Sequence, residues 1–143
     1  MIKEIVEQWD ERKHLLESWL ASSHPDSYQK LVEQLVRLVL CGDLKRRYTE
    51  SPLDPDRVAV VDHGDYQGTQ LFLVPIKRYQ PSDEDYVWLS NHYGSCSGCD
   101  ALESIREYSC ESPTAHQVSQ YMTLALHMVQ RMKWLCGDEE EGR

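Results

Sequence analysis

Apolar residues spaced three and four positions apart predict helices at the start of the chain. Within residues 2–22 this stripe consists of Ile2, Ile5, Val6, Trp9, Leu16, Trp19 and Leu20. A second helix is expected from Pro25 to Gly42, because proline suits the first turn of a helix and glycine its end. Its last turns are apolar nearly all round, so we expect it to lie deeper than the first helix and to form an antiparallel hairpin with it.

The middle of the chain changes from helical spacing to runs of β-branched and aromatic residues. Residues 43–56 show no periodicity and are predicted to be a connecting loop. Strands are expected at 58–61, 71–76 and 86–93, separated by turn-forming sequences at 63–68 and 81–85. Because these connections are short, consecutive strands are expected to pair, which gives a three-stranded antiparallel meander over residues 57–93.

Helical spacing returns in the last third of the chain. A short helix is expected after residue 97, and a long one from Pro113 to Gly137. The apolar face of the long helix is formed by Val118, Tyr121, Met122, Leu124, Ala125, Met128, Val129, Met132 and Trp134. The sequence therefore predicts one α+β domain, with element order α-α-β-β-β-α-α. Its parts are a helical hairpin (1–42), a meander (57–93), C-terminal helices (97–136) and an acidic tail (138–143).

The composition narrows the class of partner. A chain of 143 residues suits a single domain. Its net charge of −9, from 24 acidic and 15 basic side chains, argues against direct contact with nucleic acid and favours a partner protein with a basic surface. The first residues are charged and no apolar run approaches the length that spans a bilayer, so neither a signal peptide nor a membrane segment is expected. Five cysteines, an odd number, favour a reducing cytoplasm. The sequence leaves the oligomeric state open.

Cys96 and Cys99 form the pair of residues with the most chemical potential. With His92 as a third ligand they are candidates for a zinc site, although no second ligand pair follows. They are also candidates for a thiol-active pair, since Cys99 falls in the first turn of a predicted helix. The third interpretation is structural: Gly94 and Gly98 allow a tight turn and the thiols pack beneath it. No nucleophile elbow, phosphate loop or paired-carboxylate signature is present, so no catalytic residue is assigned.

Two turns carry the candidate contacts for a partner protein. Glycines at the first turn leave Asp65 and Tyr66 to project at its tip. The second turn contains three consecutive acidic residues, Asp83, Glu84 and Asp85. Together they are predicted to face a basic partner surface.

The sequences Asp65-Tyr66-Gln67-Gly68-Thr69 and Tyr93-Gly94-Ser95-Cys96-Ser97-Gly98-Cys99-Asp100-Ala101-Leu102 resemble a motif of small proteins from bacteriophages and related mobile elements. The resemblance covers about a third of the chain and implies a phage or prophage setting. Together with the charge, the small size and the lack of a catalytic signature, it leads to the hypothesis of a non-enzymatic inhibitor or modulator, of the anti-CRISPR kind, that binds a host nucleic-acid-binding or defence protein. The alternative is a zinc-stabilised or thiol-active module centred on Cys96 and Cys99; the leading hypothesis requires no cofactor.

Overall fold

The computed structural model describes residues 1–46, 49–64, 68–93, 101–106 and 111–136. Two helices are followed by a run of antiparallel strands, then by two further helices and a short final strand, and this segregation confirms the α+β class. The elements are α1 (Ile2–Ser22), α2 (Tyr28–Leu38), β1 (Leu44–Arg46), β2 (Thr49–Ser51), the 3₁₀ helix η1 (Pro55–Arg57), β3 (Ala59–Gly64), β4 (Gly68–Pro75), the 3₁₀ helix η2 (Asp83–Asp85), β5 (Tyr86–Tyr93), α3 (Ala101–Arg106), α4 (Ala115–Gln130) and β6 (Lys133–Trp134). The predicted element order is wrong, because the described residues form six strands in two sheets.

Helix α1 matches the predicted range, whereas α2 is shorter at both ends. Its first turn is capped by Ser27, whose hydroxyl oxygen accepts a hydrogen bond from the backbone N–H of Lys30 at 3.1 Å. This bond satisfies one of the backbone N–H groups that have no partner within the first turn of a helix. The helix therefore begins at Tyr28 and not at Pro25. Helix α2 ends at Leu38, and the backbone N–H of Gly42 instead donates to the side-chain oxygen of Gln8 on α1 at 3.2 Å.

The predicted meander is confirmed and forms three of the four strands of a larger sheet. Strands β3, β4 and β5 pair antiparallel in that order, with Val60 opposite Phe72 and Phe72 opposite Leu89. Strand β6 extends the sheet, because Trp134 pairs with Val87 and the backbone N–H of Leu135 donates to Tyr86 at 2.9 Å.

Two predictions about the flanking segments are wrong. The long C-terminal helix ends at Gln130 instead of Gly137, since the chain turns to pair with the open edge of β5. Backbone groups along a sheet edge gain hydrogen bonds from such a strand, which a further helical turn would not supply. Within the predicted loop 43–56, β1 and β2 form a two-stranded antiparallel sheet. Its strands are three residues each, too short to show an alternating pattern.

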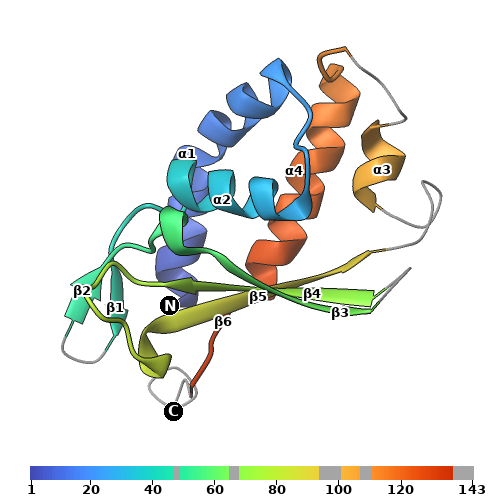
Figure 1. Cartoon of the computed structure of the whole chain (residues 1–143). Coiled ribbons are helices and arrows are strands. Elements are labelled where there is room, and N and C mark those ends of the chain that lie inside the picture. Colours follow the sequence, from blue (N-terminus) through green and yellow to red (C-terminus); the bar gives the residue numbers. More distant parts are fainter. Residues whose placement is uncertain (47–48, 65–67, 94–100, 107–110, 137–143) are drawn as a thin grey trace.

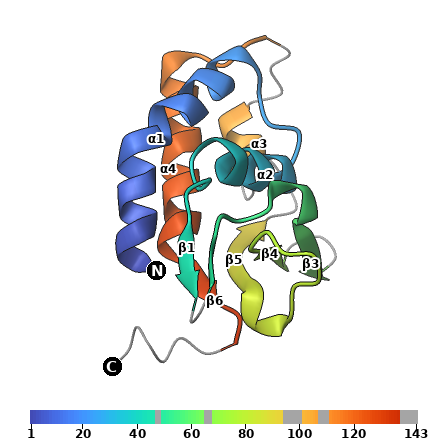
Figure 2. The ribbon, with the colours of Figure 1, turned by 90° about the vertical axis from the view of Figure 1, so that its left-hand side faces the viewer.

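The helices all lie on one side of the four-stranded sheet (Figure 1). Helices α1 and α4 run side by side in opposite directions, and α2 crosses over the sheet beside them (Figures 1 and 2). The antiparallel neighbour of α1 is therefore α4, and the predicted hairpin of the first two helices is wrong. Core side chains from the helices and the inner face of the sheet fill the space between the layers, including the fully buried Leu16, Leu35, Phe72, Leu89 and Tyr121.

Buried hydrogen bonds attach α3 to this framework. The hydroxyl oxygen of Tyr28 on α2 accepts from the backbone N–H of Leu102 at 3.1 Å. The side-chain amide of Gln117 on α4 donates to the carbonyl of Ile105 at 2.9 Å, while its oxygen accepts from Thr114 at 2.9 Å. Gln117 thus closes the N-terminal capping box of α4 and holds α3 at the same time.

Candidate functional site

A groove runs between α1 and α4. It consists of two adjoining pockets of about 610 and 590 Å³, which share Trp9, Lys13 and Leu126. The first pocket occupies the end near β6, and the second extends toward the start of α4. Each volume falls within the range of roughly 300–1,000 Å³ that is typical of ligand sites in proteins. We call this feature the α1–α4 groove.

The walls of the groove are mostly apolar. At the β6 end they are formed by Met1, Ile2, Ile5, Val6, Trp9, Leu126, Val129 and Met132, with Asp10, Lys13, Gln130 and Lys133. Ile2 and Val6 are 70% and 52% exposed, whereas Trp9 and Val129 below them are buried. The helical packing that fills the core thus continues outward into side chains that no described element covers. Their exposure to water costs free energy that a partner surface would recover.

The two walls differ in charge. Helix α4 contains no Asp, Glu, Lys or Arg over its 16 residues. Four exposed acidic residues and two exposed lysines lie on α1: Glu7, Asp10, Glu11, Glu17, Lys3 and Lys13. Any charge-dependent recognition at the groove is therefore expected along its α1 side.

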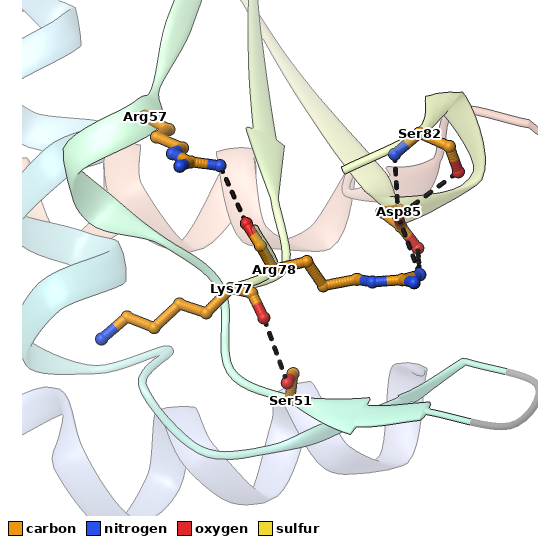
Figure 3. A network of polar contacts seen from close by, with 6 residues as sticks. All are labelled: Ser51, Arg57, Lys77, Arg78, Ser82 and Asp85. Carbon is orange, nitrogen blue, oxygen red and sulfur yellow. Dashed lines mark hydrogen bonds and ion pairs between the residues drawn. The ribbon is translucent and has the colours of Figure 1, made fainter. Parts of the chain in front are cut away.

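The predicted acidic contact at residues 83–85 has a structural component. Asp85 is 3% exposed, and its carboxylate accepts two hydrogen bonds from the Arg78 guanidinium at 3.0 and 3.1 Å. The same carboxylate caps η2 by accepting from the backbone N–H of Ser82 at 2.8 Å (Figure 3). Asp85 is therefore used internally, which corrects its assignment as a partner contact. Asp83 and Glu84 are exposed and keep that prediction.

Nearby polar contacts fasten the loop that carries this network. Arg57 donates to the carbonyl of Arg78 at 3.0 Å, and the hydroxyl of Ser51 donates to the carbonyl of Lys77 at 3.3 Å (Figure 3). These bonds join β2 and η1 to the segment that follows β4. The charged side chains of this region thus hold the end of the sheet together.

The remaining predicted site residues divide into two groups. Asp65, Tyr66, Cys96 and Cys99 lie outside the described residues, so the zinc and thiol hypotheses stay predictions. His92 is exposed on β5, where its Nδ1 lies 3.0 Å from the hydroxyl oxygen of Thr69 on β4. Within the described ranges, no three His, Cys, Asp or Glu side chains are grouped closely enough to hold a metal ion.

A buried polar pair that sequence patterns do not indicate joins the α1–α2 connection to α4. His24 Nδ1 lies 2.6 Å from the hydroxyl oxygen of Tyr121, and the rings meet edge to face. Burial, with a smaller contribution from the Arg106 charge, lowers the pKa of His24, and an interaction with the Glu111 backbone opposes this. Burial raises the pKa of Tyr121 to about 12. The pair therefore favours a neutral imidazole and a neutral phenol at pH 7.

The groove and the buried pair have different chemical capacities. His24 and Tyr121 are buried and are not among the residues that line the groove, so we assign them no role toward a molecule bound there. The groove offers apolar contacts and a charged rim, which suits binding more than reaction. None of the described helices combines the length and the apolar composition needed to cross a membrane. Comparisons with protein-family models, with curated proteins and with solved structures found no match for this chain.

Proposed function

We propose that this chain is a non-catalytic protein-binding module, which holds a basic amphipathic helix of a partner protein in the α1–α4 groove. The observation that carries the proposal is the apolar groove with exposed Ile2 and Val6, in a chain of net charge −9. An acidic protein with an apolar groove is complementary to a helix that has one apolar face and basic flanks.

The dimensions of the groove favour a helical ligand. Its lining residues on α1 extend from Ile2 to Ala21. At about 1.5 Å per residue this distance is roughly 28 Å, which a partner helix of about 18 residues would match. Two antiparallel helices leave a channel into which the side chains of a third helix can pack. Ile2, Val6, Met122 and Leu126 are the residues expected to contact its apolar face.

The negative charge of this chain favours a positively charged partner. The net charge of −9 attracts cationic proteins during the approach to the surface and disfavours acidic ones. Because α4 is uncharged, we expect the basic residues of the partner to lie against Glu7, Asp10 and Glu17 on α1. Asp83 and Glu84 belong to the same long-range field.

The biological form of the proposal follows the motif resemblance described above. We propose a phage-encoded inhibitor or modulator of a host nucleic-acid-binding or defence protein. Such partners carry basic surfaces for phosphate, to which an acidic protein can bind competitively.

A synthetic peptide pair provides a direct test. One peptide of about 18 residues has leucines at helical spacing and lysines elsewhere; its counterpart has glutamates in place of the lysines. Fluorescence anisotropy should show binding of the lysine peptide in the micromolar range and little binding of the glutamate peptide. Failure to bind the lysine peptide, or equal binding of both, would contradict the proposal.

Val6→Glu separates groove binding from general charge attraction. The substitution places a carboxylate in the apolar groove but also makes the protein more negative. If the groove is the site, affinity for the lysine peptide should fall at least tenfold; if attraction is nonspecific, affinity should stay the same or rise. Val61→Glu is the matched control, because Val61 is 46% exposed, lies on β3 and undergoes the same change of charge. Its peptide affinity should equal that of the unmodified protein.

A further inference from the structure

The face of the four-stranded sheet that points away from the helices is unusually apolar. Along β4 and β5, buried residues such as Phe72, Val74, Val87 and Leu89 alternate with residues of intermediate exposure. Because strand side chains alternate between faces, the second set points away from the helical layer. Together with Ala59 and Val61 of β3 it forms the outer sheet face, in which an apolar block of Ala59, Val61, Leu71, Leu73 and Trp88 is bordered by Thr69, Tyr86, Ser90 and His92.

Strand register makes this face continuous. Ala59 lies opposite Leu73, and Leu73 lies opposite Trp88 on the next strand. Val61 lies opposite Leu71 in the adjacent row, and Val61 is 46% exposed. No described helix covers this side of the sheet (Figure 1). An antiparallel sheet with one solvated face usually presents polar residues there, so this apolar block indicates a surface that is covered in the working state of the protein.

The same face lacks the acidic residues that dominate the rest of the chain. At the outward strand positions of the described residues there is no Asp or Glu, and Lys133 on β6 is the one Lys or Arg. Lys133 also lies at the end of the α1–α4 groove, at the edge of the sheet farthest from β3. In a molecule of charge −9, another acidic molecule can approach this face with little local repulsion.

We propose that the outer sheet face binds the same face of a second copy of this chain, so that two four-stranded sheets pack into a homodimer. A second copy has the required apolar surface and, at this face, no carboxylates to bury. A basic partner of the kind proposed for the groove would find no acidic residue here. A twofold axis through the face would place the two apolar blocks together, in the aligned geometry that is common for stacked sheets.

The size of the face predicts a weak dimer. Strands β4 and β5 have eight residues and β3 has six, so at about 3.4 Å per residue they are roughly 27 and 20 Å long, and three strands at about 4.8 Å spacing add roughly 14 Å of width. The footprint is therefore roughly 350 Å² per copy, or about 700 Å² in total, which is below the roughly 1,000 Å² of stable specific interfaces and fits a weak, transient contact. We expect dissociation in the micromolar range. Since the helical layer lies on the opposite side of the sheet, the dimer would leave both grooves open (Figure 2).

Sedimentation velocity over about 5–500 μM protein tests this proposal in the range where such a small interface should dissociate. The unmodified protein should shift from monomer to dimer as concentration rises. Val61→Glu and Ala59→Glu should each raise the dissociation constant at least tenfold, because each places two carboxylates in an apolar interface. Both residues are exposed, so circular dichroism should show unchanged folding.

Val6→Glu is the control, since it makes the same change of charge in the groove. It should dimerise like the unmodified protein but fail to bind the lysine peptide. Val61→Glu should bind the lysine peptide but fail to dimerise. A monomer at every concentration would overturn the proposal, as would Val61→Glu and Ala59→Glu variants that dimerise normally. Loss of dimerisation in Val6→Glu alone would also overturn it, by placing the contact at the groove. Peptide binding is measured separately, so failure of the dimer and failure of the groove are distinguishable.

Discussion

At the scale of single residues, the buried His24–Tyr121 pair makes stability depend on pH. Burial lowers the pKa of His24 below 6.5, so in acid the unfolded chain binds a proton that the folded chain resists. This contribution is fully present above pH 6.5 and is lost as the pH falls below it. We therefore expect the melting temperature to fall between pH 7.5 and about pH 5.

Replacing His24 isolates this effect from the other titrating groups. His24→Phe should reduce the acid-side fall in melting temperature, whereas His116→Gln, an exposed change on α4, should leave it intact. Nuclear magnetic resonance titration of His24 provides the direct measurement. A pKa at or above 6.5 would contradict the burial argument.

Single residues also show where sequence patterns stop being informative. Asp83, Glu84 and Asp85 are equivalent in a pattern of charge, yet Asp85 is buried against Arg78 because it caps η2. Met122 belongs to the predicted apolar face of the last helix and is half-buried in the wall of the groove. Periodicity identifies the face of a helix, but not whether a neighbour covers it.

At the scale of elements, the turn from α4 into β6 is the largest departure from helical spacing. Trp134 is 3% exposed and pairs with Val87, whereas the adjacent Leu135 is 41% exposed. Trp134→Ala should therefore lower the free energy of unfolding by roughly 3–5 kcal/mol, because a large buried side chain is removed. Leu135→Ala should lower it by less than about 1 kcal/mol. Urea denaturation of both variants measures this difference; equal losses would contradict the pairing of β6 with β5.

Long regular elements follow from the sequence better than short ones. The predicted range of α1 is confirmed because its apolar spacing extends over 21 residues. The pairing of β3, β4 and β5 is confirmed because short turns force neighbours together. Strands β1, β2 and β6 have two or three residues each, and over such lengths helical and strand periodicity cannot be told apart.

At the scale of the whole molecule, the groove joins segments that are about a hundred residues apart. In the sequence, Ile2 and Val6 lie at the edge of the apolar stripe of the first helix. This stripe is wider than packing against a single neighbouring helix requires. The sequence does not indicate that α4, and not α2, becomes the antiparallel neighbour of α1. Helix α2 crosses over the sheet instead of lying along α1 (Figure 1). The local acidic turns and the cysteine pair are easier to see than a groove formed by two distant helices.

The two proposed interfaces should respond to salt in opposite directions. Raising the ionic strength from about 0.1 M to about 1 M shortens the Debye length from about 10 Å to about 3 Å. Attraction between the acidic surface and a lysine peptide is then screened, so binding at the groove should weaken. Repulsion between two copies of charge −9 is screened as well, so dimerisation through the uncharged sheet face should strengthen or stay constant. Anisotropy and sedimentation on the same samples measure both. A dimer that dissociates in high salt would show that ion pairs hold it, which contradicts an apolar sheet interface. A peptide affinity that does not change with salt would show that charge does not contribute to binding at the groove.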